Sequence, residues 1–248
     1  MPAIPSTAEL LKRGVHFGHK KSRRHPKMEE FIFTVKGDLC IIDVRKTIEH
    51  LKAALAYITE VTAKGGVVLM VSTKKQSHTL LAQHAESCGA PYINGRWLGG
   101  TLTNFAVISQ LIKKFKKLKG DRETGAHEKF TKKEQLDLTR EIEELDLSIG
   151  GIQNLNKLPD AVFILDLKKD KTALTEALKK GIPIVAVCDT NANPDGIAHI
   201  IPANDDAIKS IELMLGLVAS AINEGKAKYA AGKTEVAKPE DKPTEVKA

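Results

Sequence analysis

The sequence contains no long apolar run and no paired cysteine motif. No stretch approaches the roughly 20 apolar residues that a membrane-spanning helix needs, so we do not expect a membrane protein. Residues 1 to 14 lack the basic-then-apolar order of a secretory signal, which predicts a cytoplasmic chain. Cys40, Cys88 and Cys188 stand far apart with no C-x-x-C pair. Their spacing argues against a disulfide framework and against a cysteine zinc cluster.

The common signatures of nucleotide-binding and hydrolytic enzymes are also missing. There is no G-x-G-x-x-G after a predicted strand, no G-x-x-x-x-G-K-[ST], no G-x-S-x-G and no H-E-x-x-H. These absences favour a non-enzymatic protein. The alternative that stays open is an α/β enzyme that binds a small molecule or nucleotide in the crevice at the strand ends.

Basic charge is concentrated in one short segment. The chain has 38 Lys and Arg against 31 Asp and Glu, a net charge of +7. Residues 12–27, KRGVHFGHKKSRRHPK, hold no acid and seven basic side chains, which equal the whole excess: Lys12, Arg13, Lys20, Lys21, Arg23, Arg24 and Lys27. A confined patch of one sign indicates a polyanionic partner. The alternative is a flexible, solvated loop that binds nothing.

The apolar pattern predicts an α/β fold. Runs at 67–73, 161–167 and 182–189 are apolar without alternation, as in parallel strands buried on both faces. Helices are predicted at 44–63, 75–87, 170–180 and 205–223. Residues 31–43 predict a hairpin that turns at Lys36-Gly37. Strand and helix in alternation predict a parallel sheet flanked by helices, formed by residues 1–103 and 152–223.

Residues 104–151 interrupt this alternation with two predicted helices. Each helix carries a narrow apolar seam, at Phe105, Ile108, Ile112, Phe115 and Leu118 and at Leu138, Ile142, Leu145 and Ile149. Such seams favour an inserted antiparallel coiled-coil hairpin over two ordinary packed helices, although both interpretations stay open. Thr131 and Glu134 predict a capping box at the start of the second helix, and Gly150-Gly151 predicts its end. Residues 224–248 have few large apolar side chains, which predicts a disordered C-terminal tail.

The segment GRWLGGTLTN, at 95–104, resembles a phosphate-binding turn. It follows a strand-like PYI and opens a helix at Asn104, so its backbone amides are placed to bind an anion. The side chains of Arg96, Thr103 and Asn104 are suited to contact a nucleic-acid backbone, and the indole of Trp97 is suited to stack on an unpaired base. For Trp97, packing in the core is an equal alternative.

A cation site is a further hypothesis. His19 lies in the basic segment, Asp189 ends a predicted buried strand, and Asp205 opens the last predicted helix. Loops at the carboxyl ends of parallel strands converge, so these three residues are candidate ligands of a zinc ion. Helix capping by Asp205 and a turn role for Asp189 explain both carboxylates without a metal.

Several motifs carry a resemblance to a known family. They are GVHFGH (14–19), HPKM (25–28), FIF (31–33), RWLGGTLTN (96–104), SIGGI (148–152), LPDA (158–161), GIPIVAVCDTNANPDG (181–196) and IPANDDAI (201–208). Together they resemble the ribosomal protein S2 family of the bacterial small subunit, over residues 6 to about 223. The resemblance implies a flavodoxin-like parallel sheet with a protruding coiled-coil hairpin.

The resemblance also implies a function and partners. The family is a non-enzymatic component of the 30S subunit, bound to 16S rRNA between head and body and to other ribosomal proteins. It helps to recruit the large messenger-binding protein in lineages that have it, and neither DNA nor membrane is implied. Five lysines without an acid between 104 and 120 predict that the hairpin is a docking arm. The expected RNA contacts are the seven cations of residues 12–27 with Arg96, Trp97, Thr103, Asn104, Lys113, Lys114 and Lys117.

Overall fold

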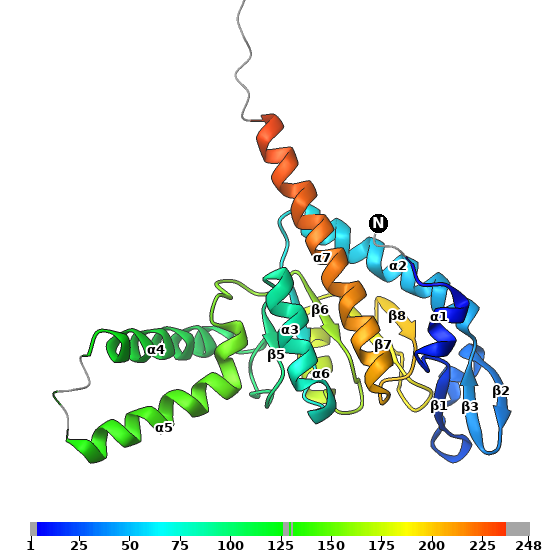
Figure 1. Cartoon of the computed structure of the whole chain (residues 1–248), viewed down its shortest axis with the longest axis horizontal. Helices are drawn as coiled ribbons and strands as arrows, with labels where there is room; N and C mark the ends of the chain where they lie inside the picture. The colour runs from blue at the N-terminus through cyan, green and yellow to red at the C-terminus, as the bar shows by residue number, and fades with distance from the viewer. Residues whose placement is uncertain (1–3, 126–128, 130, 237–248) are drawn as a thin grey trace, which may run out of the picture.

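The computed structural model describes residues 4–125, 129 and 131–236. An α/β domain carries a long helical arm at one end and a small antiparallel sheet at the other (Figure 1). In these described ranges, no helix is long and apolar enough to cross a lipid bilayer.

The elements follow one another in this order. The strands are β1 (Phe17–Lys20), β2 (Ile32–Lys36), β3 (Leu39–Ile42), β4 (Val68–Val71), β5 (Tyr92–Ile93), β6 (Ala161–Ile164), β7 (Ile184–Cys188) and β8 (His199–Pro202). The α-helices are α1 (Thr7–Lys12), α2 (Val44–Ala63), α3 (His78–Cys88), α4 (Phe105–Glu123), α5 (Lys132–Ile149), α6 (Lys171–Lys180) and α7 (Ile208–Val236). Short 3-10 turns are η1 (Lys21–Arg23), η2 (Pro26–Phe31), η3 (Lys75–Ser77) and η5 (Gly150–Ile152).

The central sheet is parallel and has the strand order β5-β4-β6-β7-β8. Numbered along the chain within this sheet, the order is 2-1-3-4-5, which is the flavodoxin-like arrangement. The expected fold class is therefore confirmed. The runs without alternation became β4, β6 and β7, whose residues are all buried.

Helices cover both faces of this sheet, because side chains of consecutive strand residues point to opposite faces. Val68 and Met70 pack in one apolar cluster with residues of α2, α3 and α7. Leu69 and Val71 pack in a second cluster with residues of α6 and with the base of the arm. Truncating Phe163, which is fully buried, is expected to cost about 3–5 kcal/mol of stability.

Local signals in the sequence set several helix ends. The Asp43 carboxylate accepts a hydrogen bond from the Arg45 amide at 2.9 Å and caps the start of α2. Gly181 adopts a left-handed conformation with φ of 67° and ends α6. The capping box of Thr131 and Glu134 is present at the start of α5.

The arm consists of α4 and α5, which contact each other. Helix α4 leads away from the domain and α5 returns to it (Figure 1). Ile112, Phe115 and Ile142 are buried along its seam, which supports the predicted projecting hairpin over two helices that lie flat on the sheet. The same three side chains belong to the second apolar cluster of the domain. The base of the arm is thus continuous with the main core.

The predicted start of the disordered tail, at Glu224, is wrong, because α7 continues to Val236. Lys226 donates from Nζ to the carbonyl oxygens of Cys88 and Gly89 and so caps the end of α3. The ring of Tyr229 lies against Gly65, where a Cβ atom would approach it to 2.8 Å. These contacts extend the helix beyond the apolar pattern. Residues 237–248 lie outside the described residues.

The small sheet has the order β1-β3-β2. The predicted hairpin at 31–43 is confirmed as β2 and β3, with Gly37 and Asp38 at positive φ in the turn. No strand was predicted for β1, which pairs antiparallel with β3.

Candidate functional site

The basic segment is held in place and is not a flexible loop. Its β1 strand pairs with β3, and the His19 amide donates to Thr190 Oγ1 at 2.8 Å. Further along, the Lys21 amide donates to the carbonyl of Asp38 and the His25 amide to that of Thr190, at 2.9 and 2.8 Å. At Gly18, a Cβ atom would lie 2.6 Å from the Thr190 side chain, so only glycine permits this approach. These contacts favour a structured segment over the flexible loop of the alternative interpretation.

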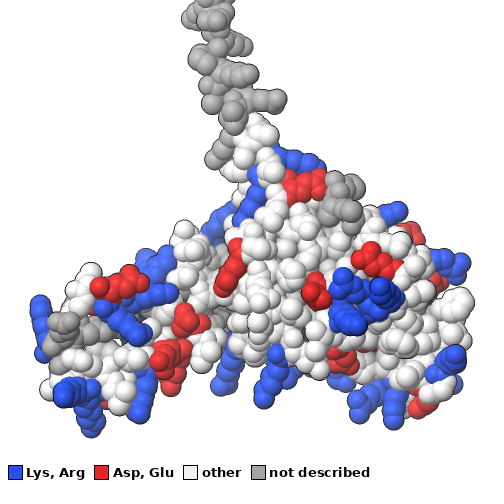
Figure 2. Space-filling view, viewed as in Figure 1, with Lys and Arg blue, Asp and Glu red and all other residues white. Residues whose placement is uncertain are grey.

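The seven cations of this segment divide into paired and unpaired groups. Arg13 pairs with Glu212 at 3.2 Å, Arg24 with Glu29 at 3.0 Å, and Lys27 with Asp195. Within the described part of the chain, no ion pair involves the other four, which are exposed: Lys12, Lys20, Lys21 and Arg23. Figure 2 shows several groups of basic side chains at this end of the molecule, with acidic side chains beside some of them. The unpaired four are the residues free to contact an external anion.

The glycine-rich turn binds an anion that the chain itself supplies. Glu176, on α6, is 6% exposed and directs its carboxylate into the turn. Oε1 accepts from Trp97 Nε1 at 3.0 Å and from the Gly100 amide at 2.8 Å. Oε2 accepts from the Leu102 and Thr103 amides at 2.9 and 3.1 Å, and from Thr103 Oγ1 at 3.1 Å. Burial raises the pKa of Glu176, but these hydrogen bonds outweigh it and hold that pKa below its usual range.

This geometry corrects part of the predicted RNA contact. Trp97 is buried at 9% exposure, so its indole cannot stack on a base. The Thr103 hydroxyl is already used by Glu176. Arg96 and Asn104 are exposed on the same turn and stay candidate contacts.

The predicted lysines of the arm lie on the surface of α4. Lys113 and Lys117 are exposed, and no ion pair of either is found among the described residues. Lys114 pairs with Glu141 of α5 at 2.5 Å and so joins the two helices. Both signs of charge cover the arm in Figure 2. Lys113 and Lys117 are the better candidates for external contact.

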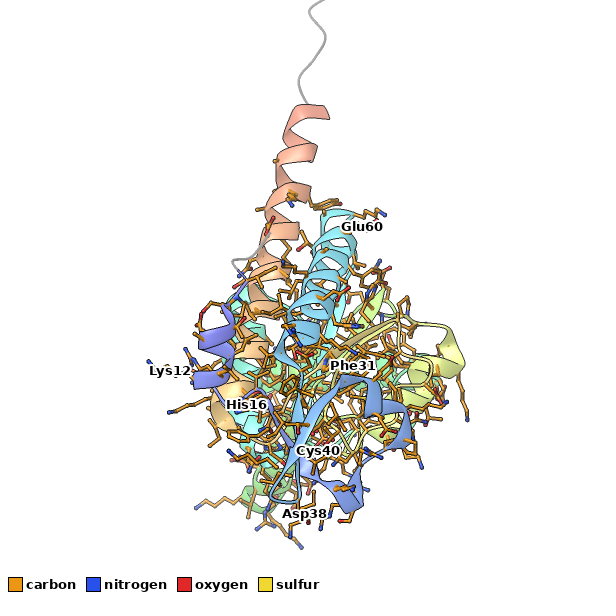
Figure 3. All side chains as sticks on the ribbon, turned by 90° about the vertical axis from the view of Figure 1, so that its right-hand side faces the viewer. Lys12, His16, Phe31, Asp38, Cys40 and Glu60 are labelled. Atoms are coloured by element: carbon orange, nitrogen blue, oxygen red, sulfur yellow. The ribbon has the colours of Figure 1, made fainter. Side chains whose placement is uncertain are left out.

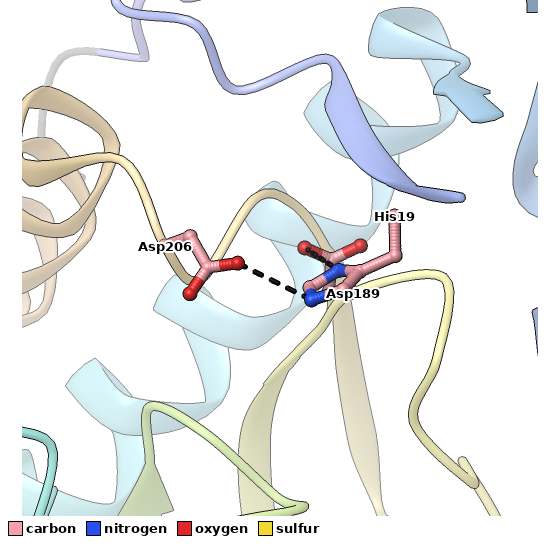
Figure 4. A group of neighbouring side chains, drawn as sticks. All are labelled: His19, Asp189 and Asp206. Atoms are coloured by element: carbon pink, nitrogen blue, oxygen red, sulfur yellow. Dashed lines mark ion pairs between the residues drawn. The ribbon is translucent and has the colours of Figure 1, made fainter. Parts of the chain in front are cut away.

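A cluster of one histidine and two carboxylates lies at the carboxyl end of the sheet (Figure 4). His19 Nδ1 is 3.1 Å from Asp189 Oδ2, and His19 Nε2 is 3.2 Å from Asp206 Oδ2. The close Asp189 carboxylate raises the pKa of His19, against the opposite effect of burial. Asp189 is 1% exposed and its Oδ2 accepts no hydrogen bond of normal geometry from any described residue.

Asp205 does not belong to this cluster, which corrects the predicted ligand set. Lys74 Nζ lies 3.1 Å from Asp205 Oδ1, 3.3 Å from Asp166 Oδ2 and 2.6 Å from Asp206 Oδ1. Burial, with help from neighbouring carboxylates, raises the pKa of Asp205 to about 7. Sequence reasoning chose the wrong member of the Asp205-Asp206 pair, because neighbouring residues cannot be separated by spacing alone.

The same ion pairs occupy the usual ligand site of this fold. Flavodoxin-like sheets bind ligands where the strand order reverses, here between β4 and β6. Lys74 follows β4, and its ammonium group contacts Asp166, which follows β6. Nearby, Thr73 Oγ1 donates to Asp170 at 2.7 Å. Charged groups that satisfy one another here disfavour the alternative of an enzyme with its substrate in this crevice.

Comparison with known proteins agrees with these observations. The sequence model of the family described as ribosomal protein S2 matches residues 10–225. The chain belongs to the ribosomal protein S2 family. A relative from Micrococcus luteus, named small ribosomal subunit protein uS2, is 45% identical over 235 residues. The alignment covers 94% of this chain and 82% of that relative.

The S2 family match includes the basic segment, the glycine-rich turn and both helices of the arm. Sequence reasoning missed Glu176, Lys74 and Asp206. A signal for Glu176 exists in α6, where Ala173, Glu176 and Ala177 are the buried residues and share one helical face. An acid in that stripe needs hydrogen-bond donors from a neighbouring element.

Proposed function

We propose that this chain is a structural component of the small ribosomal subunit that binds 16S rRNA mainly through the unpaired cations of its basic segment. One observation carries the proposal: Lys12, Lys20, Lys21 and Arg23 are exposed and unpaired on a segment held in place by backbone hydrogen bonds. A held segment loses little conformational entropy when it binds. Cations presented in this way suit the phosphates of RNA.

Two further surfaces extend the proposed RNA contact. Arg96 and Asn104 are exposed on the glycine-rich turn, and Lys113 and Lys117 on α4 just beyond it. Since α4 begins directly after the turn, with Asn104 as its N-cap residue, these residues follow one another along the chain. We propose that the arm is a docking device for RNA or for neighbouring 30S proteins, among them the large messenger-binding protein in lineages that have it.

The cluster of His19, Asp189 and Asp206 is proposed as a zinc site. One nitrogen and two carboxylate oxygens, all within 4.8 Å of one another, are suitable zinc ligands with room for a fourth. Asp189 Oδ2 is buried, and its contact with His19 Nδ1 at 3.1 Å is its only ion pair among the described residues, so a bound cation would help to balance this buried carboxylate. The competing arrangement is a protonated His19 that bridges two carboxylates, one from each ring nitrogen.

Salt titration of binding to isolated 16S rRNA tests the RNA proposal. Each phosphate contact contributes about 0.7–0.9 to the slope of log binding constant against log salt. Four unpaired cations therefore predict a slope of about −3 to −4 from this segment, against about −5 to −6 for all seven. Absence of salt-dependent binding to 16S rRNA would contradict the proposal.

A further inference from the structure

The outward face of the small sheet combines apolar and basic side chains. Directly opposed residues of antiparallel strands share a face, as do residues two apart on one strand. The strand register therefore places two rows on one face: Phe17, Ile41 and Thr34 in the first, and Lys20, Leu39 and Lys36 in the second. Each row contains one residue from each of the three strands.

The other face of this sheet is the one that packs on the domain. Cys40 and Ile42 alternate with the outward residues of β3, and they are 0% and 1% exposed. By contrast, Phe17 is 47% exposed and Leu39 is 40% exposed. Figure 3 views the molecule from the end that carries this sheet, with Asp38 at the tip of the β2–β3 turn. The described chain leaves these apolar side chains accessible.

The Phe17 ring is positioned by its neighbours. The ring of His16 lies against it with centroids 4.0 Å apart, and Gly14 approaches its edge. The Ile42 amide donates to the carbonyl of His16 at 2.8 Å, which fixes the start of β1. An exposed aromatic ring on a held backbone can bind a flat partner at low cost in conformational entropy.

Charge identifies the partner of this face. Leu39 lies between Lys20 and Lys36 in its row, and neither row contains an acid. An aromatic ring with flanking cations suits unpaired RNA, because a base stacks on the ring while the cations contact phosphates. A duplex offers no accessible base face to such a ring. The combination therefore fits single-stranded RNA better than double-stranded RNA.

We propose that the outward face of the small sheet is a binding site for unpaired RNA, with a base stacked on Phe17 and its flanking phosphates on Lys20 and Lys36. This inference rests on the proposed RNA-binding function and adds a preference for single strands. It also assigns Lys20 to a defined site together with Lys36, which lies outside the basic segment.

The test compares the full-length protein and its variants on a short oligouridine strand and on an RNA duplex of equal length. Phe17→Ala should weaken binding to the single strand by roughly 5- to 150-fold, the effect of losing one stacked base. It should leave duplex binding and the salt slope unchanged. Phe17→Tyr should retain affinity. Leu178→Ala, at an apolar residue of similar exposure on α6, is the matched control.

The same experiment separates the contribution of the lysines to binding from that of the Phe17 ring. Lys20→Ala with Lys36→Ala should reduce the salt slope on the single strand by about 1.4, or about 0.7 per phosphate contact. A Phe17→Trp variant should lose fluorescence when the oligonucleotide binds, whereas the wild type, whose only tryptophan is the buried Trp97, provides the background.

The outcomes distinguish this inference from the proposed function. If the wild type binds 16S rRNA but not the oligouridine strand, the site fails and the proposed function stands; if it binds neither the oligonucleotides nor 16S rRNA, both fail. If the wild type binds RNA but Phe17→Ala binds the single strand equally well, or loses single strand and duplex alike, only the stacking site is wrong. If 30S particles that contain Phe17→Ala lack another ribosomal protein while the RNA affinity of the variant is unchanged, the face binds protein and the inference is overturned.

Discussion

Trp97 and Glu176 are joined by a buried hydrogen bond of 3.0 Å between the indole Nε1 and the carboxylate Oε1. The glycine-rich turn that resembles a phosphate-binding loop thus closes around a carboxylate from α6. Its backbone amides bind an anion, as such turns do, but that anion belongs to the protein. These hydrogen bonds connect α6 of the sheet domain to the turn that leads into α4 of the arm.

Removing this carboxylate is expected to destabilise the fold. Glu176→Ala leaves several donors of the turn without an acceptor, and each buried unsatisfied group costs about 1–3 kcal/mol. We expect a loss of about 3 kcal/mol in the free energy of unfolding, measured by urea denaturation. Glu176→Gln should cost less because it keeps one acceptor oxygen. Glu143→Ala, at an exposed glutamate of α5, should change stability by less than about 0.5 kcal/mol.

The effect of Glu176 should depend on pH with a defined sign. Its folded-state pKa lies below the ordinary value of 4.5, because hydrogen bonds to the charged form outweigh burial. A group of this kind contributes stability above its unfolded pKa and loses that contribution as the pH falls through its folded pKa. The stability difference between wild type and Glu176→Gln should be largest above pH 4.5 and shrink below it. A difference that grows on acidification would contradict this account.

Neighbouring arginines of the basic segment should behave differently. Arg23 is exposed without an ion pair to any described residue, whereas Arg24 pairs with Glu29 at 3.0 Å. Arg23→Ala should flatten the salt slope of 16S rRNA binding by about 0.7–0.9. Arg24→Ala should change it less, since that cation is already partly neutralised. Equal effects from both variants would show that the internal pair opens on binding.

Metal analysis tests the proposed zinc site. Protein purified without chelator should retain close to one zinc per chain, and Asp189→Asn or Asp206→Asn should lose it. Asp205→Asn should retain zinc because Asp205 is not part of the cluster that His19, Asp189 and Asp206 form. Asp195→Asn, at an exposed carboxylate that pairs with Lys27, is the surface control. Zinc-free protein with unchanged thermal stability would reject the site and favour a protonated His19 between the two carboxylates.

The arm should tolerate shortening only beyond its buried base. Deletion of residues 107–147 would remove Ile112, Phe115 and Ile142, which are part of the main core. That deletion is therefore expected to impair folding. Replacing residues 119–138 with a short glycine-serine linker should keep a cooperative unfolding transition, since loop closure depends weakly on length.

The shortened arm should still affect function. Retention of this variant on 30S particles in a high-salt wash should fall if the arm is a docking device. Normal retention would show that the distal arm makes no important contact. Failure of the shortened protein to fold would show that the distal seam also belongs to the main core.

The sequence revealed the parts of the fold that depend on local patterns. The buried runs of β4, β6 and β7, the Asp43 cap and the Thr131–Glu134 capping box all follow from residues close together in the chain. Strands β1 and β8 were missed because each has only four residues and contains a histidine, which is too short for an apolar pattern to show. The extension of α7 was missed because Lys226 and Tyr229 are held by residues far away in the chain.

The candidate site shows the same division. Spacing in the sequence located the basic segment and brought His19 and Asp189 together correctly. It could not show that Arg13, Arg24 and Lys27 form ion pairs within the chain. The partners of Arg13 and Lys27 are distant in sequence, and the pairing of Arg24 with Glu29 depends on the local backbone conformation, which composition does not specify. Likewise, Glu176 lies 79 residues from Trp97 in the chain, so the anion in the glycine-rich turn was not predictable from the turn itself.

Co-sedimentation with 30S particles tests the central claim most directly. Tagged wild-type protein and a Lys20→Ala, Lys21→Ala, Arg23→Ala variant are compared after washes of increasing salt, with Arg13→Ala, Arg24→Ala, Lys27→Ala as the control of equal charge change. We expect the wild type to sediment with the particles, the first variant to be released at much lower salt, and the control to resemble the wild type more closely. Wild-type protein that remains in the supernatant, or a first variant retained as well as the wild type, would contradict the account.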